Sequence, residues 1–267
     1  MSEIHPTAIV GDQVALGERV RVGPNAILEG AVQVGAGTTI GPNAQILGPV
    51  TVGEDCQIGL GALIGGDPQI LNWKRVDSPV AIGNRTIIRE YVTIHRPKDV
   101  DGKTVIGDDC LLMGLSHVAH DCRLGNHVVV CNGSLLAGHV EVANHAFISG
   151  NCPIHQFVRI GRLAMVQGLT AVGKDVAPFT LVDQTNTARA LNSVGLRRAG
   201  FSADQRRALS RAFKEIFLSD HSLANSIAEV ASWDPIPEVR EIIDFIQASK
   251  RGVCLGNRRA AAEMSEA

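Results

Sequence analysis

The sequence is poor in aromatic residues and has no long apolar run. Aromatic side chains make up 4% of the 267 residues, with one tyrosine and two tryptophans. No stretch approaches the roughly 18 consecutive apolar residues of a transmembrane helix, so membrane insertion is not expected. The formal net charge is −2, whereas a nucleic-acid-binding face is usually clearly basic. The composition therefore predicts neither a membrane protein nor a nucleic-acid-binding protein.

The six cysteines contain no Cys-x-x-Cys pair. Four of them, Cys56, Cys110, Cys122 and Cys152, share one phase of the six-residue repeat described below. Packing explains a small side chain at that phase better than a disulfide or a metal site does. The sequence also enters its repeat directly after its first residues, without a signal peptide. We therefore expect a cytoplasmic protein with reduced thiols.

An aliphatic residue recurs at every sixth position over most of the sequence. Neither an α-helix, with a period of 3.6 residues, nor a β-strand, with a period of 2, gives this spacing. The phase is occupied by Ile4, Val10, Leu16, Val22, Leu28, Val34, Ile40, Ile46, Val52, Ile58, Ile64, Ile82, Ile88, Ile94, Ile106, Leu112, Val118, Leu124, Val130, Leu136, Val142, Ile148, Ile154, Ile160, Val166 and Val172. A fixed internal period predicts a solenoid, in which each unit buries its apolar face against its neighbours.

Two further positions of the repeat support a solenoid. Glycine often follows the aliphatic residue, as at Gly11 and Gly17, and we interpret it as a tight turn with positive φ. A small or β-branched residue, such as Ala8 or Val14, stands four positions after the aliphatic one. Three such sides close a triangular coil of about 18 residues, and about nine or ten coils stack at ~4.8 Å. The sequence thus predicts a mainly β fold, a parallel β-helix.

Two interruptions and a change of period divide the chain. Residues 66–80 and 96–104 lose the pattern, and we expect loops there, which on a rigid scaffold commonly carry function. The first loop keeps the six-residue phase, so we expect it to replace a whole coil. Beyond Pro178 the period becomes helical, with a capping box at Ser202 and helices expected near 191–200, after Ser202 and over 237–249. The predicted domains are a β-helix over 1–178 and an α-helical domain over 179–267.

Histidines gather in the second half of the repeat. On an 18-residue coil, His120, His139 and His155 lie along one edge in successive turns, with His117 at its mouth and Asp121 after His120. Stacked imidazoles raise one another's cost of protonation, which keeps at least one neutral, as a general base requires. We expect this file of three histidines to be functional. The remaining histidines are interpreted as ordinary polar residues: His5, His95, His127, His145 and His221.

The residues alone leave three interpretations open. A histidine can deprotonate an acceptor group while the backbone N–H of Gly138 holds the oxyanion of an acyl transfer. Alternatively, three histidines can bind zinc and activate water, as in a carbonic-anhydrase-like lyase or a hydrolase, provided that their nitrogens converge within ~2.1 Å of one point. A neighbouring subunit would have to contribute for that geometry. The third interpretation is a binding platform without catalysis.

Three motifs then point to a known family. They are His117-Val118-Ala119-His120-Asp121, Ala137-Gly138-His139 and Ile154-His155-Gln156-Phe157. In this order they resemble the UDP-N-acetylglucosamine acyltransferases of lipid A biosynthesis, and the segment 195–201 is similar to that family's helical domain. The likeness extends to about residue 250. It implies a left-handed β-helix, a homotrimer with active sites between subunits, and neither a metal nor another cofactor.

The resemblance also implies roles for individual residues. His120 would be the general base, oriented by Asp121, and would deprotonate the sugar 3-hydroxyl for attack on the thioester of an acyl carrier protein. Gly138 would supply the oxyanion-hole N–H. Met165 and Gly168 match positions that measure the acyl chain and contact the acceptor region. The full set expected at the substrate site is Gln69, His117, His139, His155, Gln156, Met165, Gly168, Asn192 and Arg198.

At its carboxyl end, the same resemblance assigns Asn192 and Arg198 to the nucleotide diphosphate. Basic residues of the helical domain suit an acidic acyl carrier protein as partner: Arg197, Arg206, Arg207, Arg211 and Lys214. The expected enzyme is an acyl-ACP-dependent O-acyltransferase that transfers a (3-hydroxy)acyl group to the 3-position of a UDP-N-acetylglucosamine-type sugar.

Four positions depart from the family pattern. Ile70 and Asn72 replace an acidic residue and a lysine in the first loop. Val194 and Ala199 replace a glutamate and an arginine near the nucleotide motif. These changes leave a 3-amino sugar nucleotide as the alternative acceptor.

Overall fold

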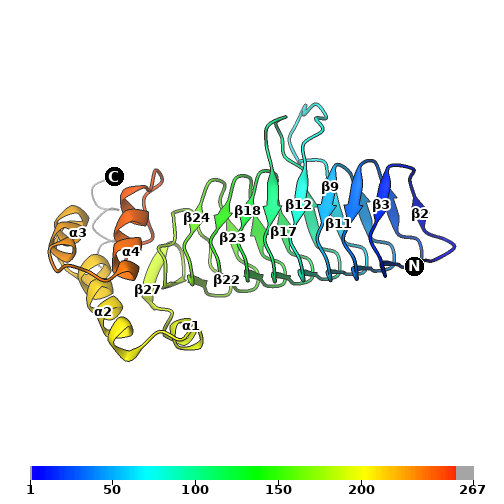
Figure 1. Ribbon diagram of the computed structural model, residues 1–267. Coiled ribbons are helices and arrows are strands. Elements are labelled where there is room, and N and C mark those ends of the chain that lie inside the picture. The colour runs from blue at the N-terminus through cyan, green and yellow to red at the C-terminus, as the bar shows by residue number, and fades with distance from the viewer. Residues whose placement is uncertain (1, 257–267) are drawn as a thin grey trace.

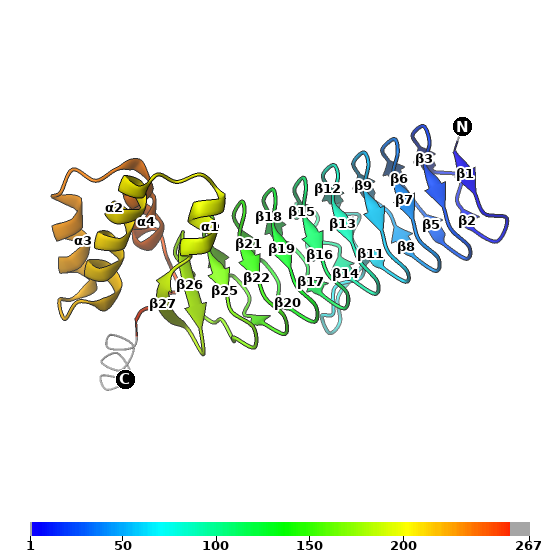
Figure 2. The ribbon, with the colours of Figure 1, turned by 90° about the horizontal axis from the view of Figure 1, so that it is seen from below.

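Short strands wind about ten turns around one axis in the computed structural model, which describes residues 2–256 (Figure 1). The predicted parallel β-helix is confirmed. The helices gather at its carboxyl-terminal end, and the amino terminus lies at the opposite end of the column (Figure 2). None of the helices in the described part of the chain is long and apolar enough to cross a bilayer.

Three sheets form the walls of the column, and successive coils contribute neighbouring strands to each. The first sheet contains β1 (Glu3–Ile4), β4 (Arg21–Val22), β7 (Thr39–Ile40), β10 (Gln57–Ile58), β13 (Ile87–Ile88), β16 (Leu111–Leu112), β19 (Val129–Val130), β22 (Phe147–Ile148), β25 (Met165–Val166), β26 (Thr180–Asp183) and β27 (Thr187–Leu191). The second contains β2 (Ile9–Val10), β5 (Ile27–Glu29), β8 (Gln45–Leu47), β11 (Leu63–Gly66), β14 (Thr93–His95), β17 (His117–Val118), β20 (Leu135–Leu136) and β23 (Pro153–Ile154). The third contains β3 (Val14–Leu16), β6 (Val32–Val34), β9 (Val50–Val52), β12 (Val80–Ile82), β15 (Thr104–Ile106), β18 (Arg123–Leu124), β21 (Glu141–Val142) and β24 (Arg159–Ile160).

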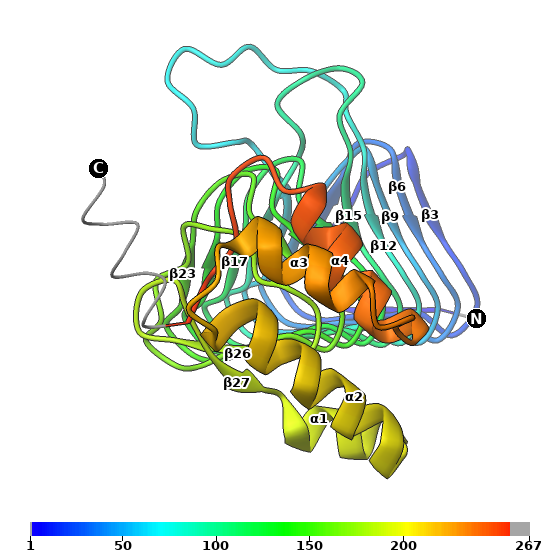
Figure 3. The same cartoon turned by 90° about the vertical axis from the view of Figure 1, so that its left-hand side faces the viewer.

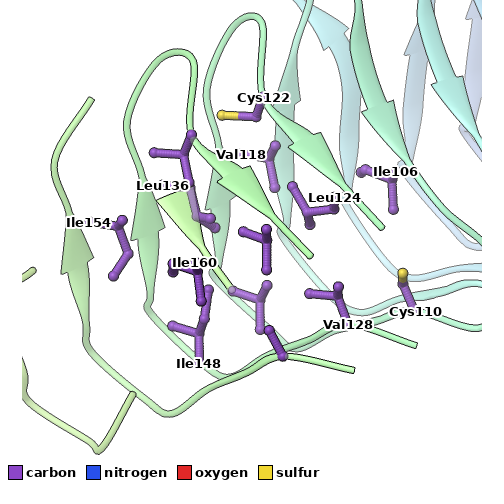
Figure 4. Close-up of a cluster of buried hydrophobic side chains, with 14 of the residues drawn as sticks. Ile106, Cys110, Val118, Cys122, Leu124, Val128, Leu136, Ile148, Ile154 and Ile160 are labelled. Atoms are coloured by element: carbon purple, nitrogen blue, oxygen red, sulfur yellow. The ribbon is translucent and has the colours of Figure 1, made fainter. Parts of the chain in front are cut away.

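The core is a continuous stack of the repeated aliphatic and small residues (Figure 4). Val118 pairs in register with Leu136, and Leu136 pairs with Ile154, so equivalent residues lie directly above one another. Cys122 and Cys110 are buried in the same stack. Cys56 and Cys152, which share the same phase of the repeat, are buried there too, and all six cysteines are free thiols. Burial of aligned apolar residues therefore fixes the register of the site-bearing coils.

The corners differ from the sequence prediction in which residue has positive φ. The left-handed conformation falls on the third residue after the aliphatic position, for example Asp121 (φ 62°) and His139 (φ 60°). Except at Gly65, the glycine that directly follows the aliphatic residue does not adopt it. That glycine is needed for close approach between coils. A Cβ atom added at Gly35 would lie 2.5 Å from the carbonyl carbon of Gly53. The prediction of a positive φ at these glycines is therefore wrong.

Two excursions lengthen their coils without shifting the register. We call residues 67–79, between β11 and β12, the first loop, and residues 96–103, between β14 and β15, the second loop. Paired positions are 30 residues apart across the first loop (Gln57↔Ile87) and 24 across the second (Ile87↔Leu111). The first loop is thus added to a complete coil, and the expectation that it replaces a coil is wrong. Both loops project from the same side of the column (Figures 1 and 3).

The carboxyl-terminal end contains more strand than predicted. Beyond Pro178, β26 continues the first sheet in parallel with β25, and β27 returns antiparallel to β26. The helical elements are α1 (Ser193–Arg198), α2 (Ala203–Phe213), the π-helix η1 (Lys214–Leu218), α3 (Leu223–Ala231) and α4 (Pro237–Gln247). The capping box at Ser202 is confirmed, whereas α3 was not predicted. Residues 257–267 of the predicted helical domain lie outside the described residues.

Candidate active site

His120 and Asp121 form a hydrogen-bonded pair at the corner after β17. The Nδ1 atom of His120 donates to Oδ2 of Asp121 at 2.8 Å. Both side chains are largely sheltered, with 15% of His120 and 8% of Asp121 exposed. The backbone N–H of Asp121 donates to Oγ1 of the buried Thr104 at 2.9 Å, which anchors the left-handed corner. Because Nδ1–H faces the carboxylate, the neutral ring presents the lone pair of Nε2 to the surroundings.

Gly138 lies directly beneath the His120 ring. A Cβ atom at this position would lie 2.5 Å from Nε2 and would overlap Cε1 of His120. Only glycine therefore leaves space for the imidazole next to this backbone segment. From the sequence, Gly138 was predicted to contribute its backbone N–H to an oxyanion hole. The structure adds a steric reason for glycine, because a side chain here would collide with the His120 ring.

Among the described residues, the N–H group at this corner position has a protein partner at some corners and none at others, such as Glu90, Asn132 and Gly138. At the equivalent corner position after β12, β15 and β18, the N–H groups of Asn84, Asp108 and Asn126 donate to a side-chain oxygen of the next coil at 2.8–2.9 Å. Within residues 2–256, no protein acceptor lies within hydrogen-bonding distance of the Gly138 N–H. This donor is therefore available to a ligand beside His120.

His139 extends the site by one coil. Its ring meets His120 edge-on, with centroids 5.2 Å apart, and its Nε2 lies 3.7 Å from Oδ2 of Asp121. On its other side it stacks on Phe157, with centroids 4.6 Å apart and an interplanar angle of 6°. Asp121, His139 and Phe157 share the left-handed corner position. The stack is therefore Asp–His–Phe, with His120 beside it.

The structure differs from the predicted histidine file at its third level. His155 and Gln156 are exposed, and Nη2 of Arg251 lies 3.1 Å from Nδ1 of His155. Phe157, and not His155, stacks on His139. The sequence signal that could have identified Phe157 is its phase, because it occupies the same position of the repeat as Asp121 and His139.

His95 contacts the candidate site, although its position in the sequence suggested an isolated residue. The His95 ring meets the His117 ring edge-on with centroids 4.7 Å apart, so the residue is not isolated. The Nδ1 atom of His117 lies 2.7 Å from Oγ1 of Thr93, which belongs to the same strand as His95. His95 comes directly before the second loop, and β14 pairs in register with β17. This pairing brings the two rings together.

The surroundings keep several of these rings neutral. Burial, followed by the neighbouring His117 and His120, lowers the pKa of His95 to about 4. Burial also lowers the pKa of His117. It lowers the pKa of His139 as well, and the smaller opposite effect of the Asp121 carboxylate does not cancel this shift. Near neutral pH these side chains are therefore uncharged. Protonation of a general base beside them is not disfavoured by neighbouring positive charges.

The low pKa of His95 predicts a pH-dependent stability. Between pH 6.5 and about 4 the unfolded chain binds a proton at His95 that the folded chain does not, so stability present above pH 6.5 is lost as the pH falls. We expect this residue to account for about 3 kcal/mol of the loss in unfolding free energy between pH 7 and pH 4. Urea unfolding at fixed protein concentration, compared between the wild type and His95→Phe, measures it. The exposed His5→Phe serves as control, and equal pH slopes for His95→Phe and wild type would contradict the prediction.

The same corner also gathers potential metal ligands. In the described part of the chain, one ligand atom each from His120, Asp121 and His139 lie within 4.8 Å of one another. The Nδ1 atom of His120 and the Asp121 carboxylate are, however, 2.8 Å apart and share a hydrogen bond. This arrangement suits a carboxylate that orients an imidazole. Metal analysis of the purified protein tests the zinc alternative, which one bound zinc per chain would support.

A cavity of about 480 Å³ lies between β22, β25 and α1. Met165, Asn192 and Arg198, which were predicted at the substrate site, line it together with His145 and Val194. The Asn192 side chain is largely occupied, because Oδ1 accepts the Gly195 N–H and Nδ2 donates to the Leu163 carbonyl, both at 2.9 Å. Asn192 therefore caps α1 and fixes it over the cavity, while Arg198 is exposed at the end of that helix.

Two predicted residues, Gln69 and Gly168, lie neither at this cavity nor among the stacked histidines. Gln69 is exposed in the first loop, and Gly168 is exposed in the coil after β25. Neither contacts the His120–Asp121 pair in the described structure. These two residues were predicted at the substrate site from their match to family motifs. In the fold, the motifs lie in more than one region of the surface.

A parallel β-helix of hexapeptide repeats with a His–Asp pair on its wall defines the class of hexapeptide transferases, and the profile of bacterial transferase hexapeptide repeats matches residues 31–66 and 103–138. A second profile, described as UDP-N-acetylglucosamine O-acyltransferase, domain 2, matches residues 175–254. The chain belongs to the family of acyl-[acyl-carrier-protein]–UDP-N-acetylglucosamine O-acyltransferases.

Individual relatives match two thirds or more of the chain. The acyltransferase of that name from Thermodesulfovibrio yellowstonii is 43% identical over 257 residues, which is 95% of this chain and 100% of the relative. A Synechocystis relative is also 43% identical, over 183 residues that cover 68% of this chain and 66% of that protein. The solved UDP-N-acetylglucosamine acyltransferase from Campylobacter jejuni is 34% identical, with a TM-score of 0.90, and the match covers 95% of this chain and 99% of that structure.

Proposed function

We propose that His120, Asp121 and Gly138 carry out the acyl transfer of this enzyme. The chain is an acyl-ACP-dependent O-acyltransferase of its family, acting on UDP-N-acetylglucosamine in the first step of lipid A biosynthesis. The observation that carries the residue assignment is the position of His120, held by the Asp121 carboxylate at 2.8 Å and packed against the backbone of Gly138. A base, its orienting group and a free N–H donor thus lie within one corner of the column.

The proposed reaction is a direct displacement. The Nε2 lone pair of His120 accepts the proton of the sugar 3-hydroxyl, and the resulting oxygen nucleophile attacks the thioester carbonyl carbon. The Gly138 N–H donates to the oxygen of the tetrahedral intermediate. As the C–S bond breaks, His120 returns its proton to the departing thiolate, which leaves an ester and the free thiol of the carrier. Asp121 keeps Nδ1–H in place and stabilises the imidazolium formed during the step.

The substrates are assigned to the surfaces around this corner. We place the acceptor beside His117 and His139, whose neutral rings offer both donors and acceptors. We place the nucleotide at the cavity lined by Arg198, and the acyl chain along Met165. The basic side chains of α2 and η1 face two adjoining hollows, lined in part by Arg206, Arg207, Arg211 and Lys214, and their charge suits an acidic carrier protein.

We also propose a homotrimer whose subunits meet beside the site. Large apolar side chains are exposed close to it, with 48% of Leu135, 49% of Phe157 and 66% of Leu115 accessible in the single chain. A second copy of the chain would cover such residues. Light scattering in solution tests this, and a mass equal to one chain would contradict it. We further propose a cytoplasmic location, in keeping with the six free thiols, which cell fractionation tests.

The acceptor preference gives a direct test of the activity. We expect the purified enzyme to acylate the 3-hydroxyl nucleotide sugar faster than its 3-amino analogue, because the transfer groups are complete. Asn72 stands at a left-handed corner (φ 60°), which asparagine adopts more readily than lysine, so its presence has a backbone explanation. Parallel initial rates, with product masses, measure the preference. Faster acylation of the 3-amino sugar would reverse the acceptor assignment while leaving the role of His120 open to test.

A further inference from the structure

A pair of hydrogen bonds connects the first loop to the proposed catalytic pair. The indole Nε1–H of Trp73 donates to the carbonyl oxygen of Lys98 at 2.8 Å. The backbone N–H of Lys98 donates in turn to Oδ2 of Asp121 at 3.2 Å. We infer that Trp73 is a positioning residue that acts, through the Lys98 backbone, on the carboxylate that orients His120. This inference rests on the proposed roles of His120 and Asp121.

The connection passes through a short and constrained piece of backbone. The carbonyl and the N–H of Lys98 belong to adjacent planar peptide units joined at one Cα atom. Pro97 precedes Lys98 and restricts the φ angle at the start of this segment. Fixing the carbonyl through Trp73 therefore limits the orientations that the N–H can take toward Asp121.

The second loop is pressed against the same carboxylate. A Cβ atom at Gly102 would overlap Oδ1 of Asp121, so glycine is required for this approach. The buried Ser78, at the end of the first loop, donates to the carbonyl oxygen of Asp99 at 2.6 Å. The first loop thus holds the second through two bonds, from Trp73 and Ser78, and the second loop encloses Asp121.

The arrangement gives Oδ2 of Asp121 two donors, His120 Nδ1 and the Lys98 N–H. Loss of the Lys98 donor would free the carboxylate to rotate, because its other oxygen faces Gly102. A displaced carboxylate no longer holds the His120 ring at the angle needed for proton transfer. The side chain of Lys98 is not part of this connection, since it pairs with Asp99 at the surface.

The substitution Trp73→Phe keeps an aromatic ring and removes the indole donor. We expect kcat to fall about tenfold, as for one lost hydrogen bond that orients a catalytic group, with both KM values within about twofold of wild type. Ser2→Ala is the matched control, because it also removes a side-chain hydrogen bond to a backbone carbonyl, that of Gly17 at 2.8 Å, at the amino-terminal end of the column. It should leave kcat unchanged. An unchanged kcat in Trp73→Phe, or a rise in KM alone, would overturn the inference.

A double-mutant cycle separates positioning from a general loosening of the loop. If Trp73 acts through Asp121, adding Trp73→Phe to Asp121→Asn should lower kcat no further. A multiplicative tenfold loss in the double variant would show that Trp73 acts elsewhere. Ser78→Ala removes the second bond between the loops and should lower kcat by a smaller factor, which gives a second measurement should Trp73→Phe fold poorly.

The outcomes also separate this inference from the proposed function. Full activity in both His120→Ala and Asp121→Asn would refute the catalytic assignment itself. Inactive His120→Ala together with a normal Trp73→Phe would refute only the role of Trp73. Thermal unfolding and the mass in solution of each variant show that the comparison is made between folded proteins.

Discussion

His120→Ala is expected to lower kcat by about 10²- to 10⁴-fold, the range that a positioned general base contributes. The variant leaves the acceptor hydroxyl without a group to take its proton, while Asp121 and the Gly138 N–H remain in place. The ring is only 15% exposed and sits at a corner outside the apolar core, so its removal should leave the column folded. Initial rates with saturating acyl carrier protein and nucleotide sugar measure the effect.

His5→Ala provides the comparison for His120→Ala. His5 is exposed near the amino-terminal end of the column, with Thr7 as its side-chain partner. We expect this variant to keep wild-type rates. A His120→Ala enzyme that retains more than about a tenth of wild-type kcat would exclude His120 as the general base.

Gly138→Ala is expected to reduce kcat about as strongly as His120→Ala does. The added methyl group would lie 2.5 Å from His120 Nε2, so either the imidazole or the wall has to move. Displacement of the ring removes the base from the hydroxyl, and movement of the wall shifts the N–H proposed for the oxyanion. A misplacement of about 1 Å can cost about 10²-fold in rate. A single methyl group should therefore inactivate the enzyme.

Gly114→Ala is the matched control because Gly114 occupies the same position of the repeat. A Cβ atom there would meet only the ends of the Glu90 and Asn132 side chains, at 3.1 and 3.3 Å. These flexible groups can move aside, so we expect wild-type kcat. The steric account fails if Gly138→Ala remains fully active, or if both alanine variants lose activity equally. Circular dichroism shows whether each variant retains the β-helix.

Much of the fold could be predicted from the sequence because one spacing is repeated throughout the column. The aliphatic residues from Ile4 to Val172 define the wall, and burial of the stack confirms their phase. The prediction was wrong where the backbone conformation mattered. Glycine suggested a left-handed turn, whereas the left-handed corner is borne by residues such as Asp121 and His139, and glycine serves close approach.

The site was predictable only in part. The phase of the repeat places His120, Gly138 and His139 in adjacent coils, which the structure bears out in their contacts. The contact between His95 and His117 could not be predicted by counting 18 residues per coil, because the second loop lengthens that coil to 24 residues. Likewise, no spacing rule joins Trp73 to Lys98, since both lie in loops whose paths depend on their own hydrogen bonds.

The two projecting loops have a consequence for engineering and for comparison among relatives. They add whole hexads, so their coils of 30 and 24 residues re-enter the wall with the same faces inward. Loops that are lengthened or shortened in steps of six residues should therefore leave the strands of the column in register. Exchanging these loops between homologues should leave the column in register but change the hydrogen bonds that reach Asp121.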